Sequence, residues 1–225
     1  MNDFKSCRAV VFDAYGTLFD VGALAWTLLG DRADAVGEVW RRKQLEYSWV
    51  RSLMGRHADF AQVTAEALDF ALAANGIGDP QLATQLLAAY RSLPAYGDAP
   101  AALAALRASR WRTAILSNGS PEMLAAAVAH ARLESALDMV LSVEDVGVFK
   151  PHPKVYGLAS QRLDLAPAEI CFVSANGWDA AGAAAFGFVV VWLDRRGAPE
   201  DRLPGHPRAR ITALGDLPAL LGVAS

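Results

Sequence analysis

Short apolar runs alternate with helical segments along most of this chain, and that alternation constrains its fold more than any other feature. The runs predict strands at Ala9–Phe12, Thr113–Leu116, Met139–Leu141, Ile170–Val173 and Phe188–Leu193. Helices are predicted between the later runs, one ending at Arg107 and others beginning at Ser120–Pro121, Pro153 and Trp178. Because the strands are apolar throughout, helices should cover both faces of the sheet. The pattern is typical of an α/β fold with a doubly wound parallel sheet.

A helical block interrupts this pattern directly after the first strand. Helices are predicted at Asp34–Met54, with Gly55 as a stop, from the capping residue Asp59 to Asn75, and over Gln81–Arg91 after Asp79–Pro80. We therefore expect a core domain made of residues 1–19 and 96–225 and a helical cap made of residues 20–95. An insertion at this point would lie over the carboxyl ends of the strands and act as a lid. The last segment, residues 195–225, is predicted to form a loop, a short closing strand and a helix.

Composition and charge exclude several classes of protein. Hydrophobic residues make up 53% of the 225 residues and charged residues 20%, which is too apolar for a disordered chain. Lys plus Arg number 21 against 24 Asp plus Glu, a net charge of −3, which is the wrong sign for a general nucleic-acid binder. The longest apolar run, Gly182–Leu193, is shorter than the ~18 residues that cross a bilayer. With no secretory signal visible, we expect a cytoplasmic protein that contacts neither membrane nor nucleic acid.

The cysteines and histidines do not form a metal or redox motif. Cys7 and Cys171 lie in or beside apolar runs without a CxxC partner, so both are predicted to be small buried hydrophobes. Four scattered histidines have no ligand spacing and are predicted to be surface or capping residues: His57, His130, His152 and His206. We expect no metal site, no cofactor and no histidine-centred catalysis.

Polar residues follow the predicted strands at the edge where open parallel sheets bind ligands. They are Asp13, Ser117–Asn118, Lys150, Ser174, Asn176 and Asp179. Each alone has a structural explanation, as a turn former, a solvated loop residue or a first-turn helix charge. Their convergence on one edge favours a functional site.

The chemistry of this set is narrow, because it holds no histidine, no thiol and no serine beside a base. The nucleophile should be a carboxylate, and Asp13 is the strongest candidate because a tight loop follows it and Thr17 can hydrogen-bond back to it. Lys150 would keep Asp13 ionised, and Asp179 would orient that lysine or take a proton from water.

These residues resemble a known family. Its four core motifs are matched by Asp13-Ala14-Tyr15-Gly16-Thr17-Leu18-Phe19-Asp20, Leu116-Ser117-Asn118-Gly119, Phe149-Lys150-Pro151 and Phe172-Val173-Ser174-Ala175-Asn176-Gly177-Trp178-Asp179. The family is the haloacid dehalogenase superfamily. The segments Trp40–Trp49 and Arg51–Gly55 in the helical block are similar to its (S)-2-haloacid dehalogenases in particular. The likeness covers nearly the whole chain and implies a Rossmann-like core with a cap.

The residue at position 15 separates this interpretation from its main alternative. Phosphatases of the superfamily carry an aspartate two residues after the nucleophile to protonate the leaving alcohol, whereas this chain has Tyr15. Halide leaves without a proton, so the site suits carbon–halogen cleavage. The alternatives are a metal-dependent phosphatase or phosphonate hydrolase, and a non-catalytic protein that binds a small carboxylate.

The resemblance implies that Asp13 attacks C2 of an (S)-2-haloacid with inversion, and that water then hydrolyses the aspartyl ester to an (R)-2-hydroxyacid. It assigns catalytic roles to Asp13, Thr17, Arg41, Ser117, Lys150, Tyr156, Ser174, Asn176 and Asp179. Ala14, Tyr15 and Ser117 would hold the substrate carboxylate, and Arg41 and Asn118 would receive the halide ion. An apolar wall would consist of Leu45, Phe60 and Trp178. It also implies a homodimer through the lid helices.

Two positions depart from the usual family pattern. Ala175 stands where a second serine is usual, and Arg42 stands where glutamine is common. Neither change removes a catalytic group, so we expect them to affect substrate range rather than reaction type.

Overall fold

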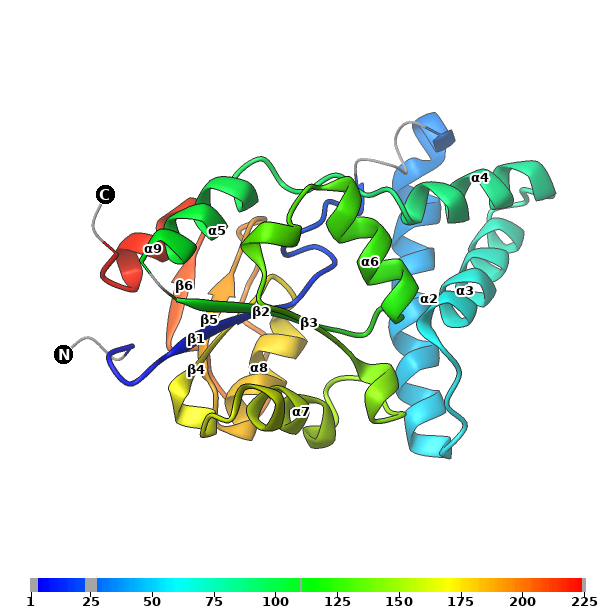
Figure 1. The fold of residues 1–225 in the computed structure, drawn as a ribbon. Coiled ribbons are helices and arrows are strands. Elements are labelled where there is room, and N and C mark those ends of the chain that lie inside the picture. Colours follow the sequence, from blue (N-terminus) through cyan, green and yellow to red (C-terminus); the bar gives the residue numbers. More distant parts are fainter. Residues whose placement is uncertain (1–3, 23–27, 110, 224–225) are drawn as a thin grey trace.

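The computed structural model describes residues 4–22, 28–109 and 111–223. In this part of the chain, six strands form one parallel sheet in the order β3-β2-β1-β4-β5-β6 (Figure 1). The strands are β1 Ala9–Phe12, β2 Arg112–Ser117, β3 Met139–Ser142, β4 Ile170–Ser174, β5 Val189–Leu193 and β6 Ala209–Ile211. The predicted α/β class and the predicted strands are confirmed, with small differences at their ends.

Helices cover both faces of the sheet, as the apolar strands required (Figure 1). One face carries α5 Ala99–Ala108, α6 Pro121–His130 and α9 Leu217–Leu220, and the other carries α7 Pro153–Leu163 and α8 Gly177–Phe186. The Ser120 hydroxyl caps α6 by accepting a 3.4 Å hydrogen bond from the Met123 amide. His152 caps α7 in the same way, through the Lys154 amide, which confirms its predicted capping role. Helix α8 begins at Gly177, one residue before the predicted start.

The helical block after β1 is present, and Figure 1 shows it beyond one end of the sheet. It contains α2 Ala33–Met54, α3 Phe60–Ala74 and α4 Pro80–Tyr90. Gly55 ends α2 with a left-handed φ of 63°, a conformation that favours glycine. The Asp59 and Asp79 carboxylates cap α3 and α4 as predicted, and Pro80 begins α4. The chain leaves and re-enters the core side by side, because the Asp20 amide donates to the Pro94 carbonyl and the Tyr96 amide to the Leu18 carbonyl, each at 2.9 Å.

Short 3-10 turns complete the described elements: η1 Gly30–Arg32, η2 Glu134–Ala136, η3 Val143–Asp145, η4 Pro167–Glu169 and η5 Leu214–Asp216. The predicted cap includes residues 23–27, and the predicted core includes residues 1–3, 110 and 224–225. Those segments lie outside the described residues.

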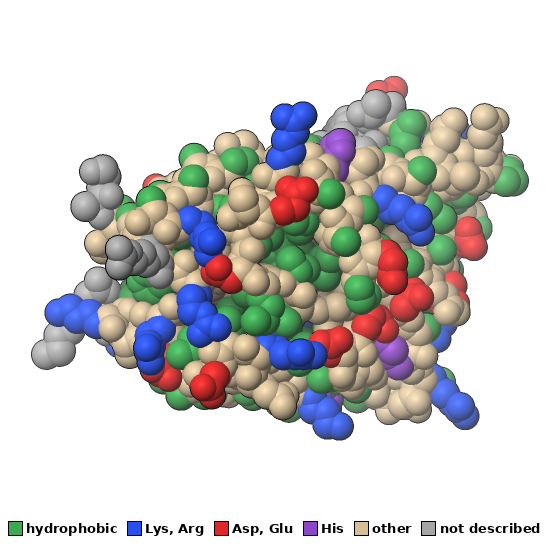
Figure 2. Space-filling model, in the orientation of Figure 1, with side chains coloured by type: hydrophobic (Ala, Val, Ile, Leu, Met, Phe, Trp, Pro, Cys, Tyr) green, Lys and Arg blue, Asp and Glu red, His purple; other side chains and the backbone are tan. Residues whose placement is uncertain are grey.

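Burial agrees with the apolar pattern of the sequence. Every residue of β1 and β4 is buried, and Cys7 and Cys171 are free, buried thiols. Burial raises the pKa of Cys7 to about 11, so this thiol stays protonated and packs as a small hydrophobe, as predicted. On the face drawn in Figure 2, acidic and basic side chains are interspersed. None of the helices within the described ranges has both the length and the apolar character that a membrane crossing needs.

The register of the sheet sets the position of the polar residues. Phe12 of β1 pairs with Ile115 of β2 and Val173 of β4. The chain order reverses at β1, since β2 and β3 lie on one side of it and β4 to β6 on the other. The residues that follow β1, β2 and β4 therefore meet at the topological switch point, where such sheets bind ligands.

Candidate active site

A buried lysine joins two carboxylates at this edge of the sheet. Lys150, in the loop before α7, places its Nζ 3.2 Å from Asp13 Oδ1 and 2.9 Å from Asp179 Oδ2. Asp13 follows β1 directly, and Asp179 lies in the first turn of α8. The Lys150 and Asp179 side chains are 1% and 0% exposed, so this ion cluster is removed from water. The structure thus brings together three residues that lie far apart in the sequence.

Burial and charge act against each other in this cluster. Burial disfavours the ammonium form of Lys150, but the carboxylates of Asp13 and Asp179 outweigh that effect and raise the pKa of Lys150 above its ordinary value. Burial also raises the pKa of Asp179, helped by the nearby charge of Asp13 and opposed by Lys150. Lys150 is therefore a permanent cation at neutral pH. Asp179 is a stronger base than an ordinary aspartate.

The second oxygen of Asp13 is fixed by two further donors. Asp13 Oδ2 accepts a 3.1 Å hydrogen bond from the Thr17 hydroxyl and a 2.8 Å bond from Asn176 Nδ2. The Thr17 oxygen accepts in turn from the Ala175 amide at 2.8 Å, and the Ser174 oxygen accepts from the Asn176 amide at 3.1 Å. The loop after β4 therefore orients the Asp13 carboxylate, and Ala175 takes part through its backbone amide, which any residue except proline supplies at this position.

Tyr156 of α7 binds the other side of Asp179. Its hydroxyl donates a 2.8 Å hydrogen bond to Asp179 Oδ1, the oxygen that Lys150 leaves free. Burial and the Asp179 charge hold the pKa of Tyr156 well above its ordinary value, so the phenol remains a neutral donor. A glycine makes this contact possible, because a Cβ at Gly182 of α8 would lie 2.6 Å from the Tyr156 hydroxyl oxygen.

Arg41 reaches the site from the cap. Its Nη2 on α2 donates a 3.1 Å hydrogen bond to Asn176 Oδ1, while the Nδ2 of the same amide binds Asp13. The neighbouring Arg42 is exposed to solvent. One of the two adjacent arginines is thus directed at the loop after β4, a distinction that helical spacing alone does not make.

The end of β2 supports the lysine loop. Asn118 Oδ1 accepts a 3.0 Å hydrogen bond from the Lys150 amide, and the buried Ser117 hydroxyl accepts from the Gly119 amide at 3.1 Å. The Oδ1 atom of Asn118 is thus bonded to the backbone amide of Lys150.

Aromatic side chains line the boundary between cap and core. The Tyr15 ring lies 6.2 Å from Phe60 of α3 and 5.2 Å from Tyr90 of α4, measured between ring centroids. The Tyr15 hydroxyl is buried and has no hydrogen-bond partner among the described residues, and burial raises its pKa well above the ordinary value. Phe60 is buried, whereas Leu45 and Trp178 are partly exposed. Tyr15 is therefore a packed neutral phenol.

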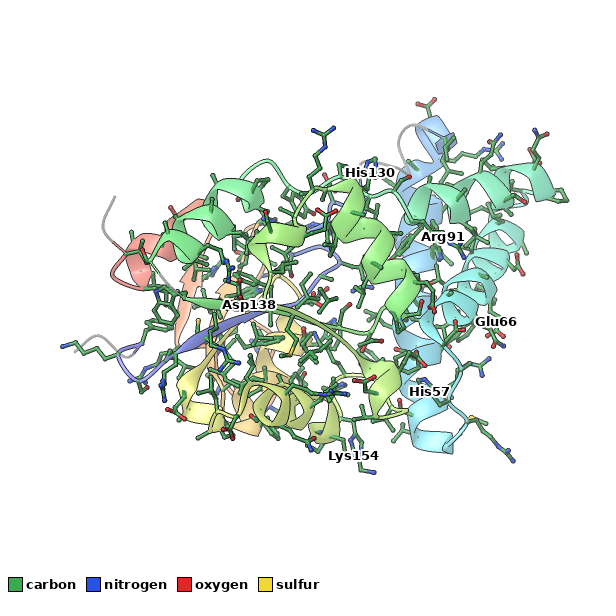
Figure 3. All side chains as sticks on the ribbon, in the orientation of Figure 1. His57, Glu66, Arg91, His130, Asp138 and Lys154 are labelled. Atoms are coloured by element: carbon green, nitrogen blue, oxygen red, sulfur yellow. The ribbon has the colours of Figure 1, made fainter. Side chains whose placement is uncertain are left out.

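Sequence reasoning missed contacts made by the far end of α2. Trp49 donates from Nε1 to the Lys150 carbonyl at 3.2 Å. Ser52, three residues further, accepts from the Phe149 amide at 3.0 Å. His57, predicted to be a surface or capping residue, is partly exposed and places its Nε2 2.9 Å from Glu144 Oε2. Figure 3 labels His57. The three-residue spacing of Trp49 and Ser52 was the one available signal, because it places both on one helix face.

Metal coordination requires several ligand side chains grouped closely together. Within residues 4–22, 28–109 and 111–223, no three His, Cys, Asp or Glu side chains are grouped so that they could hold a metal ion. The cation between Asp13 and Asp179 is the Lys150 ammonium group.

Comparison with known proteins identifies the class of protein to which this fold and this carboxylate–lysine site belong, a family of hydrolases. Residues 7–187 match the model of the haloacid dehalogenase-like hydrolases, and the chain belongs to that family. It is 48% identical over 218 residues to (S)-2-haloacid dehalogenase 1 of Pseudomonas sp. (strain CBS-3), covering 95% of this chain and 96% of that protein. It is 44% identical to (S)-2-haloacid dehalogenase 4A of Burkholderia cepacia, covering 96% and 95%.

A solved structure is also similar to this chain. The L-2-haloacid dehalogenase from Xanthobacter autotrophicus, solved with chloropropionic acid covalently bound, superposes with a TM-score of 0.89 at 42% identity. The match covers 97% of this chain and all of the other.

Proposed function

We propose that this protein hydrolyses (S)-2-haloacids to (R)-2-hydroxyacids through a covalent aspartyl ester. The observation that carries the proposal is the buried Lys150 ammonium group between Asp13 and Asp179. Relatives named (S)-2-haloacid dehalogenases, at 48% and 44% identity over almost the whole chain, support it. No cofactor or metal takes part in the scheme.

The first step is displacement of halide. The Asp13 carboxylate attacks C2 of the substrate from the side opposite the halogen, so an oxygen–carbon bond forms, the carbon–halogen bond breaks, and C2 inverts. The Lys150 ammonium group pairs with Asp13 Oδ1 and orients the carboxylate for this attack. The backbone amides of Ala14 and Tyr15, with Ser117, bind the substrate carboxylate. Arg41 and the Nδ2 group of Asn118 receive the departing halide ion.

The second step regenerates the enzyme. Water attacks the carbonyl carbon of the ester at Asp13, and Asp179 takes its proton with the help of the raised pKa that burial gives it. Lys150 and Tyr156 each hold one oxygen of Asp179 and so fix its orientation. Thr17, Ser174 and Asn176 position the ester and the developing oxyanion. The hydroxyacid leaves with one oxygen that came from Asp13 and takes up the proton held by Asp179, and Asp13 retains one oxygen from water.

Residues 20–95 act as a lid in this scheme, with residues 1–19 and 96–225 as the core. Arg41 closes the lid onto Asn176, and Leu45, Phe60 and Trp178 form the apolar wall around the substrate. A dry pocket strengthens the interactions of the ionic cluster with the reacting atoms.

The protein works in the cytoplasm. It forms a homodimer through the outer face of the lid. This face carries large apolar side chains in solvent: Leu53 is 89% exposed and Met54 65%, next to Val50 on α2 and Phe70 on α3. Burial of such a patch is a common driving force for association. Light scattering should give the mass of a dimer for the native chain, and Leu53→Glu should shift it toward the monomer.

For the phosphatase alternative, the chain lacks the aspartic acid that would protonate the leaving alcohol. At the position of the second aspartate, the chain has a buried Tyr15 whose raised pKa makes it a poor proton donor to a leaving alcohol. A non-catalytic carboxylate binder would not need the ion cluster of Asp13, Lys150 and Asp179. Burial of these charges away from water carries a free-energy penalty.

One assay separates the three functions. Halide release from (S)-2-chloropropionate is measured with a chelator present, beside hydrolysis of p-nitrophenyl phosphate with Mg²⁺. We expect halide release and a negligible phosphatase rate. Phosphate release alone would establish the phosphatase, and binding without turnover would establish the non-catalytic protein.

A further inference from the structure

The segment that carries Lys150 is held by side chains rather than by a strand or helix. The Phe149 amide donates to Ser52 Oγ at 3.0 Å, the Lys150 amide donates to Asn118 Oδ1 at 3.0 Å, and the Lys150 carbonyl accepts from Trp49 Nε1 at 3.2 Å. Two of these three side chains belong to α2 of the cap. The backbone position of Lys150 therefore depends on contacts that cross from the core to the cap.

The Ser52 hydroxyl is oriented to accept this bond. It donates its own proton to the Ser48 carbonyl at 2.9 Å, within the same helix, which directs an oxygen lone pair toward the Phe149 amide. Trp49 lies three residues before Ser52 and so faces the same side of α2. Its ring also packs edge-on against Trp178, with 5.5 Å between ring centroids. Both side chains thus have a fixed geometry when α2 is docked.

A third cap residue, His57, contacts the segment that contains Phe149 and Lys150. The His57 ring lies 4.8 Å from the Phe149 ring, centroid to centroid, and its Nε2 lies 2.9 Å from Glu144 Oε2 on η3. Trp49, Ser52 and His57 each make one contact with Phe149 or Lys150. Other cap–core contacts, such as the one between Arg41 and Asn176, meet a different loop.

We propose that Trp49 and Ser52 are positioning residues that couple docking of the cap to the placement of the Lys150 ammonium group between Asp13 and Asp179. The inference rests on the proposed function and extends it. Lys150 Nζ is 3.2 Å from Asp13 and 2.9 Å from Asp179, and a displacement of about 1 Å at a catalytic group can cost a large factor in rate. The nucleophile is therefore fully paired only when the cap is closed, when the pocket is also dry.

Substitutions that remove one bond each test the coupling. Trp49→Phe removes the Nε1 donor and keeps an aromatic ring beside Trp178, and Ser52→Ala removes the acceptor. Each should lower kcat for halide release about threefold to tenfold, the range expected for one lost hydrogen bond, with a smaller change in KM. Ser52→Thr keeps the hydroxyl and should restore kcat. Ser48→Ala is the matched control, because its hydroxyl donates to the Leu45 carbonyl of its own helix.

A second readout does not depend on activity. Hydrogen exchange of the Phe149 and Lys150 amides, measured by mass spectrometry or NMR, should speed up in Trp49→Phe and Ser52→Ala and stay unchanged in Ser48→Ala. If native enzyme releases no halide but exchange responds as stated, the proposed function fails and the coupling of cap to lysine loop stands. If native enzyme is active while both kcat and exchange are unchanged in the double variant Trp49→Phe/Ser52→Ala, the positioning role is overturned. An equal loss of kcat in Ser48→Ala would overturn it too.

Discussion

Arg41 of the cap and Asn176 of the core share a 3.1 Å hydrogen bond, and the opposite end of the same amide binds Asp13 Oδ2 at 2.8 Å. The Asn176 side chain thus lies between the cap and the nucleophile and bonds to both. Closure of the cap at this point fixes the amide orientation, because Oδ1 faces the guanidinium group and Nδ2 faces the carboxylate.

Arg41→Lys should therefore lower kcat/KM by about tenfold or more. Lysine keeps the charge, but it loses the planar guanidinium group that can bind Asn176 and still face a halide ion. Steady-state halide release checks the effect. Arg42→Lys is the control, since Arg42 is exposed, and it should leave kcat/KM unchanged. Equal rates for Arg41→Lys and native enzyme would remove Arg41 from the scheme.

Tyr156→Phe should slow the hydrolysis step and shift its pH dependence. The Tyr156 hydroxyl donates to Asp179 Oδ1 and lowers the pKa of that carboxyl, against the larger effect of burial. Without the hydroxyl the pKa of Asp179 rises further, so the acid limb of the kcat profile should move to higher pH. A lost hydrogen bond to a charged group corresponds to about 1.5–3 kcal/mol. A pH–rate profile identical to that of native enzyme would contradict the assignment of Asp179 as the base.

In native enzyme, the two limbs of the pH–rate profile should lie far apart. Asp179 must be ionised to accept a proton, and because burial raises its pKa, kcat should fall with decreasing pH at values above those of an ordinary aspartate. Lys150 must be protonated, and its pKa is raised by the two carboxylates in spite of burial, so the alkaline limb should lie above the ordinary lysine range. An alkaline limb near neutral pH would contradict this picture.

Lys150→Met should destabilise the fold in a pH-dependent way. It leaves the Asp13 and Asp179 carboxylates buried without a cation, a change that typically costs about 3–5 kcal/mol. Protonation of Asp179, whose pKa is raised by burial, relieves part of this cost, so the Tm difference from native protein should be largest near neutral pH and shrink as the pH falls. Thermal unfolding at several pH values measures it. A Tm difference that stays constant with pH would show that the ion cluster does not titrate as described.

Gly182→Ala should impair the enzyme through Tyr156. The added Cβ would lie 2.6 Å from the Tyr156 hydroxyl oxygen and 2.7 Å from Pro151 Cβ, closer than atoms pack, so Tyr156 must move away from Asp179. Both Tm and kcat should fall. Gly97→Ala is a suitable control, because a Cβ there meets no atom within 4 Å. A fully active Gly182→Ala would show that the Tyr156 contact is dispensable.

The sequence was sufficient to predict most strands of the sheet, because they are short, mainly apolar runs, and two of the helices that follow begin at the capping residues Ser120 and His152. It also indicated that Asp13, Lys150 and Asp179 would meet, since parallel strands end at one edge. Which oxygen of Asp13 binds which donor depends on loop geometry that no periodic pattern encodes.

The roles of Trp49 and Ser52 were not predicted for a related reason. An aromatic ring and a serine on a helix face are typical of ordinary packing and surface positions. Their partners are the backbone atoms of Phe149 and Lys150, about a hundred positions further along the chain. Backbone partners leave no residue-type signal in a sequence. Such contacts become visible only when the cap is placed on the core.

The central claim is that Asp13 forms an ester with C2 of the substrate and that water then attacks the Asp13 carbonyl carbon. A single turnover in heavy-oxygen water, with enzyme in excess over (S)-2-chloropropionate, tests it directly by mass spectrometry of both the product and the peptide that contains Asp13. The account predicts heavy oxygen in the Asp13 carboxylate and none in the lactate. Heavy oxygen in the lactate, with an unlabelled peptide, would show direct attack of water on C2 and contradict the account.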